Sequence, residues 1–424
     1  MHPLITHLMK HLSKLFLLFL GLNSTTGLFA QKDTLRVVYY NLLKFPGSTA
    51  DRADSFKVIF DYLKPDILCV TELLNESGAD LILNTSLGTN YARTPYIDGF
   101  DTETQVYYNT NKLGMVRYDS ISTAGSTSVG ASRYIGYTRL YCKEPSLGNH
   151  RDTQYVDVIG MHLTASNSSS DSISRYVQTK MLKNWMSGRP HIKFVLVGGD
   201  LNVYTDQEVG YQTLLDSGST KLKDPINRPG RWNNNAAFAD VHTQSTRVRA
   251  FNGGATGGMD DRFDFILTSD SILQGSRLKY IPNTYKAVAN NGQLFNDSLT
   301  HPPLTTLVPW PILSALYNAA DHLPVYMEME FTYKQVISLT DADAEAFHLT
   351  VSPNPTQGLL QVVDHRATSQ PLQYKLTDLA GKELLKGNLQ GNTTLDLTHL
   401  PSGLYLLYAL QDEAQTCQRI LLQH

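Results

Sequence analysis

Short apolar runs recur along the first half of the chain, and each of them ends in a polar residue. Four such runs, rich in Val, Ile, Leu and Tyr, occupy residues 35–40, 67–71, 156–161 and 194–199. Continuous apolar runs of this length are typical of strands that are buried on both faces. The pattern therefore predicts central strands that need helices or a second sheet on each side.

Two segments between these runs repeat apolar residues at helical spacing. The first ends before Pro65 and the second before Gly188, and both residue types terminate helices. The apolar positions are Phe56, Ile59, Phe60 and Leu63 in the first segment and Ile173, Val177, Met181 and Trp185 in the second. Strands that alternate with helices predict an α/β domain.

The residue that follows each apolar run is polar: Asn41, Glu72, His162 or Asp200. When strands alternate with helices, successive strand ends meet at one edge of the sheet, where such sheets bind ligands. Taken singly, Asn41 and Asp200 fit turns and Glu72 fits a surface charge. His162 fits a hydrogen-bonded core histidine. The coincidence of all four predicts a functional site.

Later motifs extend this pattern to about residue 331. A glycine-rich stretch at 253–258 leads into an apolar run that contains Asp264, and Asp321 and His322 precede a final strand. After Lys334 the sequence changes to short strands between turns, which predicts a small β-sandwich of about 80 residues. The predicted strands lie at 360–363, 372–379, 403–410 and 419–422.

The N-terminus predicts a secretory signal peptide over residues 1–30. Lys10 and Lys14 precede a short apolar run, and Ala30 provides the small residue at which a signal peptidase cuts. The run is shorter than the ~20 apolar residues of a membrane span, and a buried N-terminal helix is the alternative. The mature protein is expected to begin near Gln31 and to be secreted or displayed at the cell surface, without stable membrane insertion.

Charge and cysteine content limit the functional classes. The chain has 36 Lys and Arg against 39 Asp and Glu, a formal charge of −3. No strongly basic surface is therefore expected to attract nucleic acid non-specifically. Cys69, Cys142 and Cys417 are odd in number and widely spaced, which argues against a disulfide framework or a zinc site.

The candidate site consists of oxygen donors and two histidines. Such a set suits Mg²⁺, with Mn²⁺ or Ca²⁺ as alternatives. The sequence lacks the His-Glu-x-x-His, Gly-x-Ser-x-Gly and Gly-Lys-Ser/Thr motifs, which argues against a zinc protease, a serine hydrolase and a P-loop enzyme. Phosphate ester cleavage is the reaction class that remains.

These polar residues lie in short motifs with a fixed order. The motifs are Asn41 after its strand, Glu72 in Val-Thr-Glu-Leu, Asp200 and Asn202 in Gly-Asp-Leu-Asn, Asp264 in Arg-Phe-Asp-Phe-Ile, and Asp321 and His322 in Asp-His-Leu-Pro. The set resembles the endonuclease/exonuclease/phosphatase superfamily from about residue 35 to 331. His162, followed by Arg175 and Gln178, is similar to the pancreatic deoxyribonuclease and neutral sphingomyelinase branches. The resemblance implies a two-sheet, four-layer α/β sandwich of the deoxyribonuclease I-like type.

For the metal and the water, the roles follow from what a phosphodiester needs. Glu72, with Asn41 nearby and Asp321 as an outer partner, is expected to hold Mg²⁺ against the charge that grows on the phosphoryl oxygens. Asp200 is expected to orient or deprotonate the attacking water, which Asn202 helps to position.

The two histidines are expected to act on the phosphoryl group and on the departing oxygen. Asp264 is expected to accept a hydrogen bond from His322, which favours the imidazolium that stabilises the transition state. His162 is then left to protonate the departing oxygen. Arg133 fits either a contact with the substrate phosphate or a surface position on a strand.

The C-terminal motifs carry a second resemblance. They are Val351-Ser352-Pro353-Asn354-Pro355 with Gly358, Leu379-Ala380-Gly381-Lys382, and Leu400-Pro401-Ser402-Gly403-Leu404-Tyr405. They look like the C-terminal sorting domain of the type IX secretion system, which implies that this machinery is a partner. The alternative is a β-sandwich that binds carbohydrate or partners. The expected boundaries are 31–334 for the catalytic domain, 335–347 for a linker and 348–424 for the sorting domain.

Three functions are compatible with the sequence. The first is a nuclease that acts as a monomer on extracellular DNA or RNA. The second is a phosphatase or phospholipase C-type enzyme that cleaves lipid or sugar-phosphate headgroups, although no segment stands out as an exposed apolar hairpin. The third is a non-catalytic surface protein that retains the fold. The loop 290–313 fits a lid or a plain surface excursion.

Overall fold

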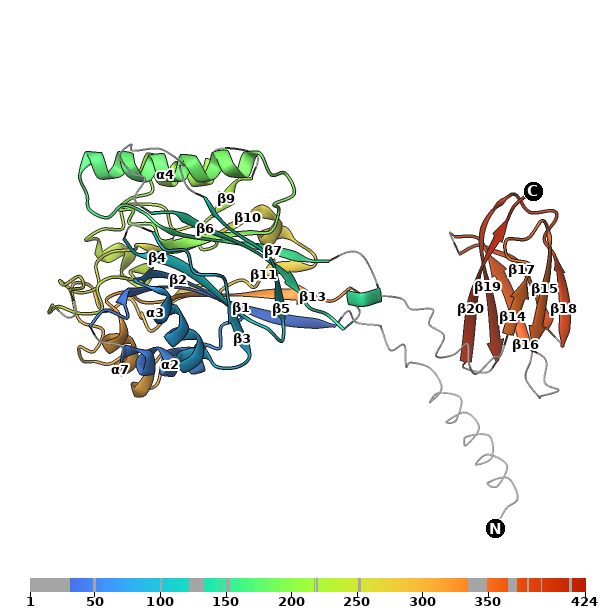
Figure 1. Cartoon of the computed structure of the whole chain (residues 1–424), viewed down its shortest axis with the longest axis horizontal. Helices are drawn as coiled ribbons and strands as arrows, with labels where there is room; N and C mark the ends of the chain where they lie inside the picture. Colours follow the sequence, from blue (N-terminus) through green and yellow to red (C-terminus); the bar gives the residue numbers. More distant parts are fainter. Residues whose placement is uncertain are drawn as a thin grey trace, which may run out of the picture. The chain divides into compact units, whose positions relative to one another are not determined.

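The computed structural model divides into two compact units, Met1–Gln335 and Val336–His424, which are described separately (Figure 1). The structure describes residues 31–48, 51–99, 101–121, 133–145, 147–149, 153–216, 218, 220–250, 253–334, 349–364, 372–379, 381–389, 391–411 and 414–424. The predicted signal peptide, residues 1–30, and the predicted linker, residues 335–347, lie outside the described residues.

Two sheets form the centre of the first unit. In the described part of this unit, the larger sheet has seven strands: β11 (Leu278–Tyr280), β13 (Val325–Thr332), β1 (Lys32–Phe45), β2 (Ile67–Leu73), β4 (Glu103–Asn109) and β3 (Tyr91–Arg93) in order, with β12 (Lys286–Ala287) beside β13. The other has six strands in the order β5 (Leu113–Ile121), β6 (Ile135–Cys142), β7 (Tyr155–His162), β8 (Val195–Asp200), β10 (Asp264–Ser269) and β9 (Leu222–Lys223). The predicted strands are therefore confirmed.

Helices form the outer layers, and apolar side chains of both sheets fill the space between the sheets. The larger sheet is covered by α2 (Arg52–Leu63), α3 (Glu76–Leu81), the π-helix η1 (Ile82–Leu87) and α7 (Trp310–Ala319). The other sheet is covered by α4 (Ser169–Ser187), α5 (Val209–Asp216) and the 3₁₀-helix η3 (Ala236–Val241). Short connections contain η2 (Leu147–Asn149) and α6 (Asp270–Gln274). This arrangement confirms the predicted two-sheet, four-layer α/β sandwich.

The strand register brings polar strand ends together. β1 and β2 are parallel, with Asn41 opposite Thr71, directly before Glu72. β7 and β8 are also parallel, with His162 opposite Asp200. β10 runs antiparallel to β8, with Asp264 opposite Asp200. The ends of strands from both sheets thus carry the predicted site residues.

The second predicted helix forms, but only two of its four apolar positions, Met181 and Trp185, pack against the core. Ile173 is 59% exposed and Val177 is 37% exposed on α4. The buried residues of α4 are Ser174, Arg175, Gln178, Thr179, Leu182, Lys183 and Met186. Arg175, for example, donates to the backbone carbonyls of Thr164 and Ser166. The helix holds neighbouring loops through polar contacts, which apolar spacing does not reveal.

The second unit is a small β-sandwich, as predicted. Its described strands form one sheet of β14 (Leu349–Ser352), β15 (Leu359–Asp364) and β18 (Asn392–Asp396), and another of β17 (Glu383–Leu389), β16 (Leu372–Thr377), β19 (Gly403–Gln411) and β20 (Ala414–Leu422). Leucines such as Leu360, Leu376 and Leu395 fill its core. Across the described residues of both units, no helix combines the length and apolarity that a membrane crossing requires.

Gly160 on β7 marks a close approach of the two sheets. A Cβ atom at this position would lie 2.7 Å from Sγ of Cys69 and 3.3 Å from Cβ of Thr104. We predict that Gly160→Ala lowers the free energy of unfolding by about 1–3 kcal/mol, because the added methyl overpacks the core. Urea denaturation measures this change.

Gly148 provides the matched control for this substitution. A Cβ atom at Gly148 would have no neighbour within 4 Å. Gly148→Ala is expected to change the free energy of unfolding by less than about 0.5 kcal/mol. Equal effects of the two substitutions would contradict the close packing at Gly160.

Candidate active site

The carboxylate of Asp200 lies at the centre of the candidate site. Asn41 donates from Nδ2 to Oδ2 of Asp200 over 3.0 Å. The Nε2 atoms of His162 and His322 lie 3.6 and 3.8 Å from the same oxygen. The backbone N–H of Asn202 donates to Oδ1 over 3.0 Å. Burial, with the nearby carboxylates, raises the pKa of Asp200.

Asn41 connects Asp200 to Glu72. The same Nδ2 atom donates to Oε1 of Glu72 over 3.0 Å. Oδ1 of Asn41 accepts the N–H of Leu43, and Oε2 of Glu72 accepts the N–H of Lys44. The amide nitrogen therefore holds two carboxylates together while the amide oxygen faces the backbone. These are the contacts of a positioning residue, and the predicted ligand role of Asn41 stays a prediction.

Left-handed backbone carries several residues of this cluster. The φ angles are 62° at Glu72, 49° at Asn202, 49° at Leu43 and 48° at Lys44. Asn adopts this conformation readily, whereas longer side chains do so at a cost of about 1–3 kcal/mol each. Such backbone is found chiefly where the surrounding structure determines it, as at binding and catalytic sites.

His322 and Asp264 form a buried pair. Nδ1 of His322 lies 2.6 Å from Oδ2 of Asp264. Burial opposes the charge on the ring, but the attraction of Asp264, then of Asp321 and Asp200, raises the pKa of His322 well above its ordinary value. The contact expected from the sequence is therefore present, and Asp264 favours the charged form of the ring.

The surroundings of His162 shift its pKa in the other direction. Its Nδ1 lies 3.3 Å from Oγ1 of Thr102, and its Nε2 lies 3.7 Å from Oε1 of Glu72. Burial, together with the positive charges of Arg133 and His322, lowers the pKa of His162 well below its ordinary value. The surroundings thus favour the neutral form of His162 and the charged form of His322 around a single carboxylate.

Arg133 borders the site with its charge already paired. Its Nε and Nη2 atoms donate to Oδ2 of Asp101 over 2.8 and 2.6 Å. Its Nη1 atom donates over 3.1 Å to the carbonyl of Leu163, the residue after His162. Arg133 is therefore close to the cluster, and its predicted contact with a substrate phosphate stays a prediction.

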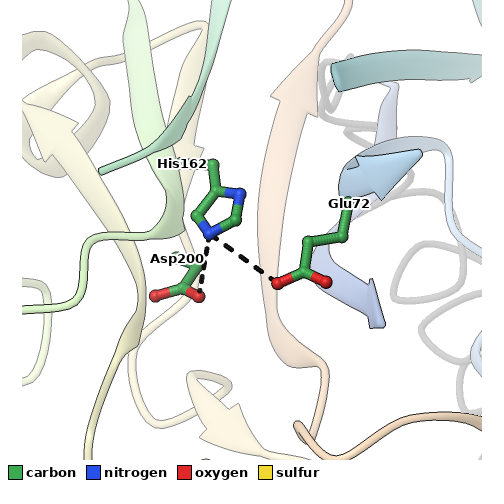
Figure 2. Close-up of side chains that lie close together, drawn as sticks. All are labelled: Glu72, His162 and Asp200. Carbon is green, nitrogen blue, oxygen red and sulfur yellow. Dashed lines mark ion pairs between the residues drawn. The ribbon is translucent and has the colours of Figure 1, made fainter. Parts of the chain in front are cut away.

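Glu72, His162 and Asp200 could hold a divalent cation. One ligand atom from each lies within 4.8 Å of the others, and Figure 2 shows Nε2 of His162 facing both carboxylates. In the described part of the chain, neither Glu72 nor Asp200 forms an ion pair with Lys or Arg. Two adjacent carboxylates with no Lys or Arg paired to them suit a cation.

Asp321, the residue before His322, is a further buried carboxylate outside this group. It is 3% exposed, and its Oδ2 accepts the N–H of Ala255 over 2.6 Å. Its Oδ1 is buried and has no hydrogen-bond partner among the described residues. A buried carboxylate oxygen without a donor is unfavourable unless a cation or water satisfies it. The donor set therefore fits Mg²⁺ or a similar ion.

Two buried arginines that the sequence did not point to support the site. Arg52 fixes the segment after Asn41, and Arg247 fixes the segment before Asp321. Their guanidinium groups donate to the carbonyls of Leu42, Leu43 and Ala319 and of Tyr317 and Ala320, respectively. A lone arginine in a polar stretch gives no sign in the sequence that it is buried.

Two residues that touch the histidines were also missed. Thr102 contacts His162, and Gln244 contacts His322. Neither residue follows an apolar run. The rule that located Asn41, Glu72, His162 and Asp200 was a polar residue directly after an apolar run. That rule therefore could not find Thr102 or Gln244.

The C-terminal unit matches a known family model. Residues 350–423 match the model described as the secretion system C-terminal sorting domain. That match confirms the predicted sorting domain. Among curated proteins, no sequence matches the chain.

Solved structures are similar to about 70% of the chain. Danio rerio TDP2 complexed with a single-strand DNA product is 12% identical, covers 70% of this chain and 99% of its own, and has a TM-score of 0.47. An endonuclease/exonuclease/phosphatase family protein from Bacteroides thetaiotaomicron is 16% identical, with coverages of 72% and 98% and a TM-score of 0.43. The human Nocturnin catalytic domain is 16% identical, with coverages of 71% and 98% and a TM-score of 0.42.

The Bacteroides thetaiotaomicron structure carries the name of the superfamily that the motifs resemble. At these identities and TM-scores, the likeness does not extend to substrate, metal or catalytic residues.

Divalent cations are expected to stabilise the first unit through Glu72. At a concentration ten times the Kd, a cation that binds only the folded state adds about 1.4 kcal/mol, or about 2–4 °C in Tm. We predict that Mg²⁺ or Mn²⁺ raises Tm relative to EDTA in the wild type, but not in Glu72→Gln. Differential scanning calorimetry measures the shift.

Asp61 on α2 serves as the control carboxylate. It forms an exposed surface ion pair with Lys57. Asp61→Asn is expected to keep the metal-dependent rise in Tm. A rise that persists in Glu72→Gln would place the cation elsewhere.

Proposed function

We propose that the first unit is a divalent-metal-dependent phosphodiesterase, with nucleic acid as its substrate class. The arrangement around Oδ2 of Asp200 is the observation that carries the proposal. This one oxygen lies within 3.8 Å of a neutral histidine, a charged histidine and an amide that also binds Glu72. A proton acceptor, a proton donor and a cation site side by side are what hydrolysis of a phosphate diester requires.

Glu72 would hold the metal ion, with Asp321 as a further carboxylate and Asn41 keeping the ligands in place. When bound, Mg²⁺ neutralises the negative charge that grows on the phosphoryl oxygens. Asp200 accepts a proton from the attacking water. Because burial raises the pKa of Asp200, this carboxylate is a stronger base than an exposed aspartate. Asn202 donates to Oδ1, and Oδ2, which accepts from Asn41 and faces both histidines, is the oxygen that would take the proton.

The two histidines act on the phosphoryl group and on the departing oxygen. His322, held by Asp264, donates from its charged ring to a phosphoryl oxygen and stabilises the transition state. His162 protonates the departing oxygen. Its ring is neutral in the free protein, and the negative charge of a bound phosphodiester favours the imidazolium. Arg133 then supplies a positive charge at the border of the site.

The sorting domain implies export of the enzyme. Residues 350–423 match a secretion sorting domain, and we propose that type IX secretion releases the protein or displays it at the cell surface. The signal peptide proposed for residues 1–30 would direct the first step of this route. Extracellular nucleic acid is then an accessible substrate.

Headgroup cleavage is the second candidate function. The loop 290–313 exposes 43% of Leu304, 57% of Leu307 and 55% of Trp310, although the sequence showed no exposed apolar hairpin. Leu299 of this loop donates its N–H to the carbonyl of Thr246, whose own N–H donates to the carbonyl of Asp321. Exposed apolar side chains on such an enzyme favour an amphiphilic substrate.

Substrate preference and residue roles can be tested together. The mature protein is expected to cleave plasmid DNA, RNA and a chromogenic phosphodiester faster than sphingomyelin, and EDTA is expected to abolish cleavage. Asp200→Asn and His322→Ala are each expected to lower kcat by about 10²–10³-fold, because each removes a group that acts in the transition state.

Asp270→Asn, at an exposed position outside the site, is the control and is expected to keep full activity. Wild-type rates in either site variant would refute these roles. Preferential cleavage of sphingomyelin would favour the second candidate function.

The pH profile tests the charge of His322. Because Asp264 raises the pKa of His322, the wild type is expected to stay active above pH 6.5, the ordinary value for histidine, and to lose activity only as the ring loses its proton. In Asp264→Asn the ring loses this partner, so the alkaline limb of kcat is expected to move to lower pH by about one unit or more. An unchanged limb would contradict a catalytic imidazolium at position 322.

A further inference from the structure

His322 is held at both ring nitrogens. Asp264 contacts Nδ1 over 2.6 Å, and the amide nitrogen Nε2 of Gln244 lies 2.6 Å from Nε2 of His322, the arrangement in which this ring nitrogen accepts. Nε2 is also the atom that faces Asp200, at 3.8 Å. Gln244 is therefore in direct contact with the nitrogen that faces the reaction centre.

The backbone fixes the position of Gln244. Its segment pairs with Asp261 on one side and with His322 on the other. The N–H of Leu323 donates to the carbonyl of Thr243, and the N–H of Thr246 donates to the carbonyl of Asp321. Gln244 thus lies on a chain segment that is bonded on both sides of the Asp321-His322 pair, and its side chain is only half-exposed.

An amide is the side chain that can hold this nitrogen in both states of the ring. In the neutral ring with hydrogen on Nδ1, Nε2 accepts from the amide N–H. In the imidazolium, Nε2–H donates to the amide oxygen after the amide turns over. A carboxylate could serve only the second state, and an apolar side chain could serve neither.

We propose that Gln244 is a positioning residue that fixes the ring of His322 so that Nε2 faces Asp200 and a phosphoryl oxygen of the substrate. This inference rests on the proposed function for its catalytic part. The contact itself stands apart from that function, because it joins two side chains of the free protein.

Spectra of the free protein test the contact without activity. Histidine is labelled with ¹⁵N, the ring signals are recorded, and His322 is assigned with His322→Gln. The Nε2 signal of His322 is expected to move in Gln244→Leu and to stay in place in Gln212→Leu. Gln212 is the matched control, a half-exposed glutamine whose amide donates to the carbonyl of Asp206. An unmoved His322 signal in Gln244→Leu would overturn the proposal.

Kinetics test whether the contact matters for the reaction. Gln244→Leu is expected to lower kcat on a chromogenic phosphodiester about tenfold with KM within about twofold, which corresponds to loss of one hydrogen bond to a charged group. Gln244→Glu, which keeps an acceptor at the same length, is expected to retain more activity. In a His322→Ala background, Gln244→Leu should have no further effect.

Equal losses from Gln244→Leu with and without His322 would overturn the positioning role. If the wild type cleaves no phosphodiester while the His322 signal still moves, the proposed function fails and the positioning contact stands.

Discussion

The site depends on a single constraint: the carboxylate of Asp200 is buried where strands of two sheets end. A buried carboxylate needs donors or positive charge around it. The fold supplies an amide from β1, a histidine from β7 and a second histidine from the segment before β13. Because each partner comes from a different segment, the strands of both sheets must be correctly paired for the cluster to form. The geometry of the site and the stability of the fold are therefore linked.

Positive charge and hydrogen-bond donors offset the repulsion between the carboxylates of the cluster. His322 offsets Asp264 directly, and Asn41 separates Glu72 from Asp200 with one shared nitrogen. The buried Oδ1 of Asp321 has no donor among the described residues. A divalent cation would complete this balance, so the proposed metal has a structural role as well as a chemical one.

The sequence predicted the parts of the site that obey a local rule. Asn41, Glu72 and Asp200 follow apolar runs that predict buried strands. β8 ends at Asp200, whereas β1 and β2 continue past Asn41 and Glu72 to Phe45 and Leu73. Helix α4 shows the limit of prediction from apolar spacing. Ile173 is exposed and Arg175 is buried, the reverse of the usual burial of apolar side chains and exposure of charged ones. The guanidinium of Arg175 binds loop carbonyls, and the spacing of apolar residues does not identify such partners.

The spacing of apolar residues also could not identify the residues that support the site, because their partners are distant in the sequence. Arg52, Arg247 and Gln244 act through backbone carbonyls or a ring nitrogen that are distant in sequence. Their roles depend on where the loops close, and loop closure is set by tertiary packing. The site could be located from the sequence, whereas the contacts that orient it required the structure.

Anomalous diffraction from crystals of the first unit with Mn²⁺ would locate the cation. We expect a peak at about 2.0–2.5 Å from a carboxylate oxygen of Glu72, beside Asp200 and with the ring of His322 facing the same cleft. A peak remote from Glu72, or Asp200 and His322 in separate surroundings, would contradict it.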